Sequence, residues 1–170
     1  MTSGVLMFDK KDPAAFDLQG LDVRVVKDNF TDVLREQLIN FWLKNGAIQD
    51  RHEAIRRTSE VICLAFDDES QIAGVSSVYP TRIGQDIYLQ YRTYTRKDCR
   101  IYGLMNKLYL QTVKYLQAQA DQNRIKEKGM LVVTENPKFN TPAGEKLLRE
   151  GGLEKVGLDQ RKLPVWKLDF

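Results

Sequence analysis

The sequence predicts an α/β (α+β) fold in which helices cover a central β-sheet. Short segments with alternating apolar and polar residues indicate strands, and longer segments with apolar residues at three- and four-residue spacing indicate amphipathic helices. The two kinds of segment follow one another along the chain, without a low-complexity tract or a linker between them. A chain of 170 residues with 42% hydrophobic content can bury one core, so we expect a single domain.

The first half of the chain predicts a strand, two helices and a β-hairpin. Residues 21–26 alternate as a strand does, and residues 31–44 repeat apolar side chains at helical spacing up to an Asn-Gly stop. A shorter helix is expected at residues 49–58. Two β-rich runs, residues 61–66 and 71–79, are separated by a four-residue polar turn, which is typical of a hairpin.

The second half predicts a strand, a long helix, a buried strand, a further helix and two final strands. Pro80 and Gly84 are expected in the connection that precedes the first of these strands. Asn140 is the expected cap of the later helix, with a proline in its first turn, and two glycines end that helix. The expected ranges are 87–95, 104–117, 130–133, 140–150, 153–156 and 163–168.

The strand at residues 87–95 carries polar side chains on both of its faces. Tyr88, Arg92 and Tyr94 share one face, because side chains alternate along a strand. Since neither face is wholly apolar, we expect one of them to line a site. This tyrosine and arginine face could orient an acidic or aromatic ligand, or it could simply pack on a helix.

The junction between that strand and the long helix has the chemistry of an anion-binding site. A helix that begins after a short loop directs unpaired N–H groups and partial positive charge toward whatever lies over the loop. Arg96, Lys97 and Arg100 add full charges, and Gly103 allows an anion to approach the main chain without a Cβ in the way. We therefore expect a phosphate group here.

The composition argues against several other functions. The net charge of +3 is low for non-specific nucleic-acid binding, and no apolar run approaches the ~20 residues that cross a bilayer. A basic leader followed by a long apolar core is absent, so we expect no signal peptide. Cys63 and Cys99 make no disulfide framework, which favours a reducing cytoplasm. With His52 as the single histidine, neither a usual zinc site nor a Ser-His-Asp triad is expected.

Two local motifs carry a resemblance to a known family. The junction reads Arg100-Ile101-Tyr102-Gly103-Leu104-Met105, and a later segment reads Val132-Val133-Thr134-Glu135-Asn136, then Asn140-Thr141-Pro142-Ala143 and a helix that ends in Gly151-Gly152-Leu153. The chain resembles the GCN5-related N-acetyltransferase (GNAT) family in both motifs and in the order of its elements. The first motif is similar to the family's coenzyme A signature. The resemblance covers residues 21–170 and leaves residues 1–20 as an N-terminal extension.

The resemblance implies a mixed, mostly antiparallel sheet of six to seven strands, about four flanking helices, and a fourth and fifth strand that splay apart. It also implies acetyl-CoA as co-substrate and direct transfer of the acetyl group to an amine. The pantetheine would lie between the splayed strands, with main-chain N–H groups of Tyr94 and Thr95 facing the thioester carbonyl. The residues expected to bind the rest of the co-substrate are Arg100, Ile101, Tyr102, Gly103, Leu104 and Met105 at the pyrophosphate and Asn140 at the pantetheine arm.

The sequence departs from the family pattern at two places. Met105 stands where the signature has a second small residue, so the phosphate loop could be wider or the helix start shifted. Leu147 and Leu148 stand where the family often has a tyrosine that protonates the thiolate, so no general acid is assigned. Glu135, directly after the fifth strand, is the candidate general base. Asp86 is a weaker candidate, because it precedes the fourth strand at its far end.

The leading hypothesis is thus a GNAT-type N-acetyltransferase that uses acetyl-CoA, without a metal, on a small-molecule or protein amine. One alternative is a longer-chain N-acyltransferase of the acyl-homoserine lactone or acyl-amino acid synthase type. A second alternative is a catalytically decayed binding module. We expect neither a nucleic-acid nor a membrane partner, and a homodimer is left open.

Overall fold

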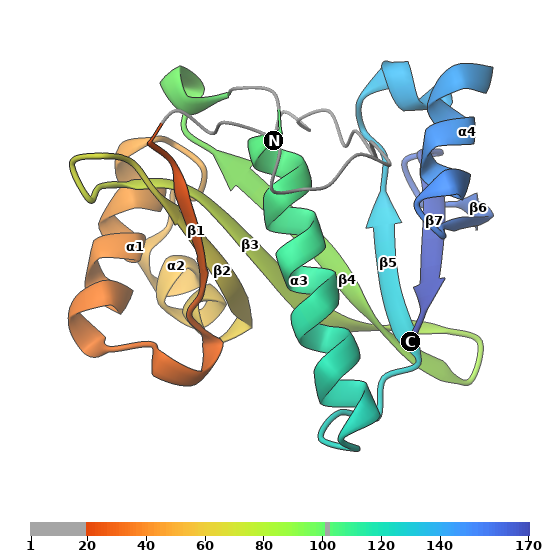
Figure 1. The fold of residues 1–170 in the computed structure, drawn as a ribbon, viewed down its shortest axis with the longest axis horizontal. Coiled ribbons are helices and arrows are strands. Elements are labelled where there is room, and N and C mark those ends of the chain that lie inside the picture. The colour runs from red at the N-terminus through yellow and green to blue at the C-terminus, as the bar shows by residue number, and fades with distance from the viewer. Residues whose placement is uncertain (1–19, 101–102) are drawn as a thin grey trace.

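The computed structural model describes residues 20–100 and 103–170, so the predicted extension lies outside it except for Gly20. Figure 1 shows the fold. Its helices and strands are β1 (Asp22–Val25), α1 (Asp32–Lys44), α2 (Arg51–Arg57), β2 (Val61–Phe66), β3 (Ile72–Ile83), β4 (Asp86–Thr95), α3 (Leu104–Asp121), β5 (Gly129–Val133), α4 (Pro142–Glu150), β6 (Glu154–Leu158) and β7 (Pro164–Asp169). This order agrees with the expected one throughout.

The strands form one seven-stranded sheet in the order β1-β2-β3-β4-β5-β7-β6. Neighbouring strands are antiparallel except for β4 and β5, which are parallel. A parallel pair needs a long crossover connection, and α3 provides it. The expected mixed, mostly antiparallel sheet flanked by about four helices is confirmed.

The helices cover both faces of the sheet, and each face has its own apolar core. On one face α1 and α2 bury residues such as Leu38 and Trp42 against β2 and β3. On the other face α3 and α4 bury residues such as Leu108 and Leu148 against β1 to β5 and β7. We call these the α1/α2 face and the α3/α4 face. In Figure 1 the long helix α3 crosses in front of the sheet, on the α3/α4 face.

The helix caps follow ordinary side-chain chemistry, with one change from expectation. Thr31 caps α1 by accepting the N–H of Leu34 at 3.2 Å. At α4 the cap is Thr141, which accepts the N–H of Gly144 at 3.2 Å, whereas Asn140 had been expected there. Asn140 instead ends a short 3-10 turn, Pro137–Asn140, that precedes the helix.

Pro80 lies inside β3, where a connection was expected. The strand continues to Ile83, beyond the last β2 pairing, Val61↔Ser77. From there on β3 has a free edge on the β2 side, and proline is tolerated at an edge because no N–H is needed there. The longer strand extends the β3–β4 hairpin beyond the body of the sheet.

The two edges of β4 differ sharply. On one side β4 pairs with β3 from Gly74↔Thr95 to Ile83↔Asp86. On the other side it pairs with β5 only at Leu89↔Met130 and Gln90↔Leu131. Beyond these two pairs β5 continues with β7 as its neighbour, and Figure 1 shows β4 and β5 diverging upward. The expected splay of the fourth and fifth strands is confirmed, and we call the unpaired stretch the β4–β5 gap.

No helix within residues 20–100 and 103–170 combines the length and the apolar character needed to span a membrane.

Candidate functional site

The long helix α3 begins beside the β4–β5 gap, on a glycine with left-handed backbone geometry. Gly103 has φ +94° and precedes the first helical residue, and its carbonyl accepts the N–H of Lys107 at 2.8 Å. Any other residue would cost about 1–2 kcal/mol in this conformation. The N–H groups of residues 104–106 have no acceptor within the helix, and the helix dipole adds positive charge beside them. The start of α3 therefore offers unpaired main-chain N–H groups at the place where the anion site is predicted.

The side chains around this helix start divide into buried and exposed ones. Leu104 is fully buried, so only its main chain is available to a ligand. Met105 is buried as well, and its Sδ accepts the hydroxyl of Thr93 at 3.7 Å. The helix start is not shifted, and the side chain of Met105 lies against β4. Arg100 is exposed, whereas Ile101 and Tyr102 lie outside the described residues.

The register of β4 determines which of its N–H groups face the gap. The N–H of Arg96 donates to the carbonyl of Ala73 at 2.8 Å, which places this N–H on the β3 side. Since main-chain groups alternate along a strand, the N–H of Tyr94 also faces β3, while those of Thr93 and Thr95 face the gap. Of the expected pair, Thr95 therefore directs its N–H into the gap and Tyr94 does not, while Thr93 does. This direction could have been predicted only from the hydrogen-bonding register.

The side chain of Tyr94 has a structural partner on α1. Its hydroxyl donates to the carbonyl of Asn45 at 3.2 Å, and its ring packs edge-on against Phe41 at 5.8 Å. Tyr94 thus fixes the end of β4 to the end of α1.

Arg96 is engaged within the protein, although it was expected to add charge to the anion site. Its guanidinium donates to Asp67 at 2.8 Å, to Asp98 at 2.7 Å and to the carbonyl of Ile72 at 3.1 Å. These carboxylates raise the pKa of Arg96, and its hydrogen bond lowers the pKa of Asp67. Arg96 therefore closes the β2–β3 turn, which leaves Lys97 and Arg100 as the exposed cations of the loop.

The candidate base Glu135 lies just beyond the end of β5. Its Oε1 accepts a hydrogen bond from Arg161 at 2.8 Å, and its side chain is 30% exposed. Asn140 accepts the hydroxyl of the buried Thr134 at 3.3 Å, which places it near the same strand end. Asp86 lies at the opposite end of β4, where it pairs with Lys128 at 2.7 Å.

The α4 positions that lack the family's tyrosine are apolar in the structure too. Leu148 is fully buried in the core of the α3/α4 face. Tyr91 and Tyr109 are in the same core, where their rings meet edge-on at 5.6 Å. Burial raises the pKa of both tyrosines, so they stay neutral at ordinary pH. Neither is assigned as a general acid.

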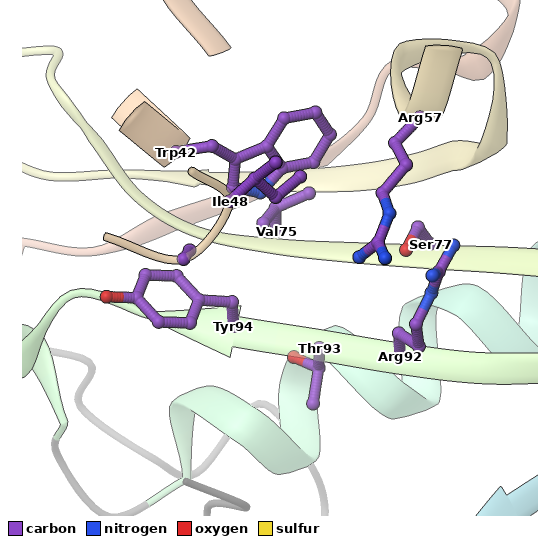
Figure 2. Close-up of a pocket in the computed structure, with 9 residues that line it drawn as sticks. Trp42, Ile48, Arg57, Val75, Ser77, Arg92, Thr93 and Tyr94 are labelled. Carbon is purple, nitrogen blue, oxygen red and sulfur yellow. The ribbon is translucent and has the colours of Figure 1, made fainter. Parts of the chain in front are cut away.

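The cavities on the α1/α2 face include two that border the β3–β4 hairpin. The first, of about 20 Å³, lies between α1, α2 and the β3–β4 pair, and Figure 2 shows the residues around it. The second is a groove of about 710 Å³ between the β3–β4 hairpin and the last two strands, lined by both apolar and polar side chains. Tyr79 lies on the groove and Arg92 on the first cavity, and these side chains stack at 4.2 Å. The cavities are therefore neighbours on the face opposite α3.

The residues of the first cavity that the sequence did not predict include its polar contributors Arg57 and Ser77. Arg57 is one of several charged residues on a short helix, and that pattern is typical of a solvated surface. Among residues 20–100 and 103–170, no three side chains of the metal-binding types gather at one place.

The comparisons with known proteins give similar solved structures. No protein-family model and no curated protein matches the chain. An aminoglycoside 6'-acetyltransferase type Ii has a TM-score of 0.58 at 15% identity, with 86% of this chain and 94% of that chain covered. A GCN5-related N-acetyltransferase from Kribbella flavida has a TM-score of 0.57 at 16% identity, with coverages of 89% and 99%. AtaTR bound with AcCoA has a TM-score of 0.51 at 13% identity, with coverages of 88% and 94%.

These identities are too low to carry a substrate from one protein to another, but the coverages include most of each chain. The chain therefore has the fold of the GCN5-related N-acetyltransferases.

Proposed function

We propose that this protein is an acyl-CoA-dependent N-acyltransferase that moves an acetyl group from acetyl-CoA to an amine. The observation that carries the proposal is the β4–β5 gap, which lies next to the start of α3. An extended pantetheine arm can occupy such a gap as an added strand, hydrogen-bonding to unpaired main-chain groups. The solved structure of AtaTR, a similar fold bound with AcCoA, supports this choice of ligand.

In the proposed complex the pyrophosphate lies on the N–H groups at the start of α3. The left-handed Gly103 exposes these groups, and the exposed Arg100 adds a full charge. The side chains of Leu104 and Met105 are buried, so they take part through the main chain only. Asn140, near the end of β5, is the proposed contact for the pantetheine arm.

The proposed reaction is a direct attack of a neutral amine on the thioester carbonyl. A C–N bond forms, the C–S bond breaks, and coenzyme A leaves as the thiolate. The gap-facing N–H groups of Thr93 and Thr95 would stabilise the negative charge that develops on the carbonyl oxygen. Because thiols have a pKa near ~8.5, the leaving group needs no strong general acid.

An amine with a pKa near ~10 must lose a proton before it attacks. Glu135 is the proposed base, acting directly or through water, because it lies at the end of β5. Its ion pair with Arg161 would hold the carboxylate in place. In a Glu135→Gln variant we expect kcat to fall about 100-fold at neutral pH, and the loss to shrink as the pH rises toward the pKa of the amine.

The acceptor amine is proposed to approach from the α1/α2 face. The other face is covered by α3, while the α1/α2 face has two cavities beside the strands that bound the gap. Both a small molecule and a protein terminus fit this arrangement. The similar structure named as an aminoglycoside 6'-acetyltransferase shows that this fold serves small-molecule amines in at least one other protein.

Calorimetric titration with coenzyme A tests the co-substrate, and thiol release in the presence of amines tests the reaction. We expect binding of coenzyme A and thiol release with acetyl-CoA. Absence of binding at millimolar coenzyme A would refute the proposal. Faster release from octanoyl-CoA would instead support the longer-chain acyltransferase, and binding without release to any amine would support the decayed binding module.

A further inference from the structure

The small cavity on the α1/α2 face presents two arginine side chains from different elements. In Figure 2 Arg57 extends from α2 and Arg92 from β4, and both guanidinium groups lie next to the hydroxyl of Ser77. Trp42 and Ile48 form an apolar wall on the other side. A cavity with two like charges and a hydroxyl at one end and an apolar wall at the other suits an anion on an organic ligand.

Arg92 is desolvated and only partly paired. One terminal nitrogen pairs with Glu60, and the guanidinium stacks on the ring of Tyr79 at 4.2 Å. Its Nε is buried and has no hydrogen-bond partner within the described part of the chain. Burial lowers the pKa of Arg92, and the charge of Arg57 lowers it further. An unpaired buried donor on a charged group is costly, so a second anion here would be stabilising.

Arg57 is also held with part of its guanidinium free to face the cavity. Its Nε donates to Glu53 at 2.5 Å, and its side chain is 24% exposed. Ion pairs join Arg56, Arg57 and Arg92 to two carboxylates, those of Glu53 and Glu60. Three guanidinium groups against two carboxylates leave this cluster with a charge of +1, which one further carboxylate would neutralise.

We infer that this cavity binds a carboxylate of the acceptor, so that the substrates are amines that also carry an acidic group, such as amino acids. This inference rests on the proposed acyltransferase function. A guanidinium fork matches a carboxylate through two parallel hydrogen bonds. The volume of about 20 Å³ admits a small group such as a carboxylate.

The position of the cavity agrees with this role. The cavity lies over β3 and β4 and reaches Thr93 and Tyr94 of β4. The edge of β4 that faces away from β3 borders, along this stretch, the gap where the thioester is proposed to lie. A carboxylate at Arg57 and Arg92 would therefore hold the amine of the same molecule on the acceptor side of the gap. The acceptor's carboxylate would act as an anchor and would take no part in the chemistry.

Matched pairs of acceptors test the inference by activity. Glycine, β-alanine and 4-aminobutyrate are each compared with their primary amides, which keep the amine and lose the negative charge. We expect kcat/KM to be at least about tenfold higher for the best carboxylate than for its amide, as expected for a charge-assisted hydrogen bond. Equal values for all three pairs, or a preference for O-phosphoethanolamine, would overturn the inference.

Variants then locate the effect. Arg57→Gln should reduce the carboxylate-to-amide ratio toward one, while Arg51→Gln, on the same helix but paired with Glu36, should leave the ratio unchanged. Because Arg92→Gln would remove one of the two guanidinium partners of the largely buried Glu60, the double variant Arg92→Gln/Glu60→Gln is used in its place. An unchanged ratio in both Arg57→Gln and the double variant would contradict the assignment.

A binding measurement keeps the inference separate from the proposed function. Trp42 lines the cavity, and Trp166, the other tryptophan, is fully buried on the α3/α4 face, so it gives a constant background. We expect 4-aminobutyrate to change the fluorescence in a saturable way, its amide to have no effect, and Arg57→Gln to weaken binding about tenfold. Failure of coenzyme A to bind would sink the proposed function alone. A flat titration with all three carboxylates would sink the inference alone.

Discussion

The two edges of β4 belong to the same strand, yet one is fully paired and the other is largely open. The edge toward β3 is paired from one end of the strand to the other, whereas the edge toward β5 is paired at two positions only. Both edges are formed by the main chain of the same run of residues, so local propensity does not distinguish them. What differs is the neighbour, because β5 turns toward β7 and α3 begins above the point where the two strands part.

This difference separates structural residues from candidate binding residues in a way that can be tested. Residues where neighbouring strands are fully paired should affect folding and leave coenzyme A affinity alone. Residues around the β4–β5 gap should affect coenzyme A affinity more than folding.

Gly129 is the first residue of β5, where this strand is paired with β7, and its substitution should give the largest effect on stability. A Cβ at this position would lie 2.0 Å from the carbonyl oxygen of Leu168 and 2.9 Å from the Cα of Asp169 in β7. The main chains of β5 and β7 would have to separate. We expect Gly129→Ala to cost about 3 kcal/mol or more and to lower Tm by roughly 6–12 °C, measured by thermal unfolding. An unchanged Tm would mean that the main chains of β5 and β7 can separate at little cost.

Gly103 lies at the start of α3, beside the β4–β5 gap, and its substitution should give the largest effect on coenzyme A binding. Alanine at φ +94° costs about 1–2 kcal/mol, and the relaxation that relieves it rotates the N–H groups at the start of α3. We expect Gly103→Ala to weaken coenzyme A at least about tenfold by calorimetry. The control is Gly84→Ala in the β3–β4 turn, with φ +60° and no atom within 4 Å of the new Cβ. The control should lose similar stability and keep its affinity, and a similar loss of affinity in both variants would contradict the assignment.

The sequence predicted the paired side of the molecule well, because its signals are local. The β2–β3 hairpin follows from two β-rich runs and a polar turn, and in the structure the carboxylate of Asp67 accepts the N–H groups of Glu69 and Gln71 in that turn. The alternation along β4 was equally clear. Pro80 was misplaced because an edge position is defined by where β2 ends, which the residues around Pro80 do not reveal.

The open side could not be predicted from local patterns. The splay came from the family resemblance, since its cause is the pairing of β5 with β7, which is distant in sequence. The structural role of Arg96 depends on Asp67 across the hairpin, and a basic loop gives no sign of it. The approach of Arg57 to Arg92 depends on how α2 sits on the sheet, so the small cavity is visible only in three dimensions.

Arg100 and Arg96 extend the comparison to charged side chains of one loop. Arg100 is exposed next to the helix start, whereas Arg96 is held by two carboxylates and a carbonyl. We expect Arg100→Glu to weaken coenzyme A about tenfold, with the effect reduced at high salt, and to leave Tm nearly unchanged. Arg96→Gln should do the reverse, lowering Tm and leaving the affinity within about threefold. Equal effects on affinity would return Arg96 to the phosphate site.

Substitution of Asp67 should give the smallest effect. The way its cost in unfolding free energy changes with pH assigns Asp67 to the paired edge of β4. The hydrogen bond from Arg96 lowers the pKa of this carboxyl below its ordinary value near 3.8, so the folded state favours the charged form. This stabilisation is complete above the unfolded pKa and is lost as the pH falls through the lower, folded pKa. We expect Asp67→Asn to cost about 1 kcal/mol at pH 7 in urea unfolding, and the difference from the unsubstituted protein to shrink below about pH 4.

Coenzyme A affinity at pH 7 should not change, because Asp67 secures the edge of β4 that faces away from the gap. A loss of affinity in Asp67→Asn would show that the paired edge and the open edge are coupled, and that the division between them drawn from the pairing pattern is too simple.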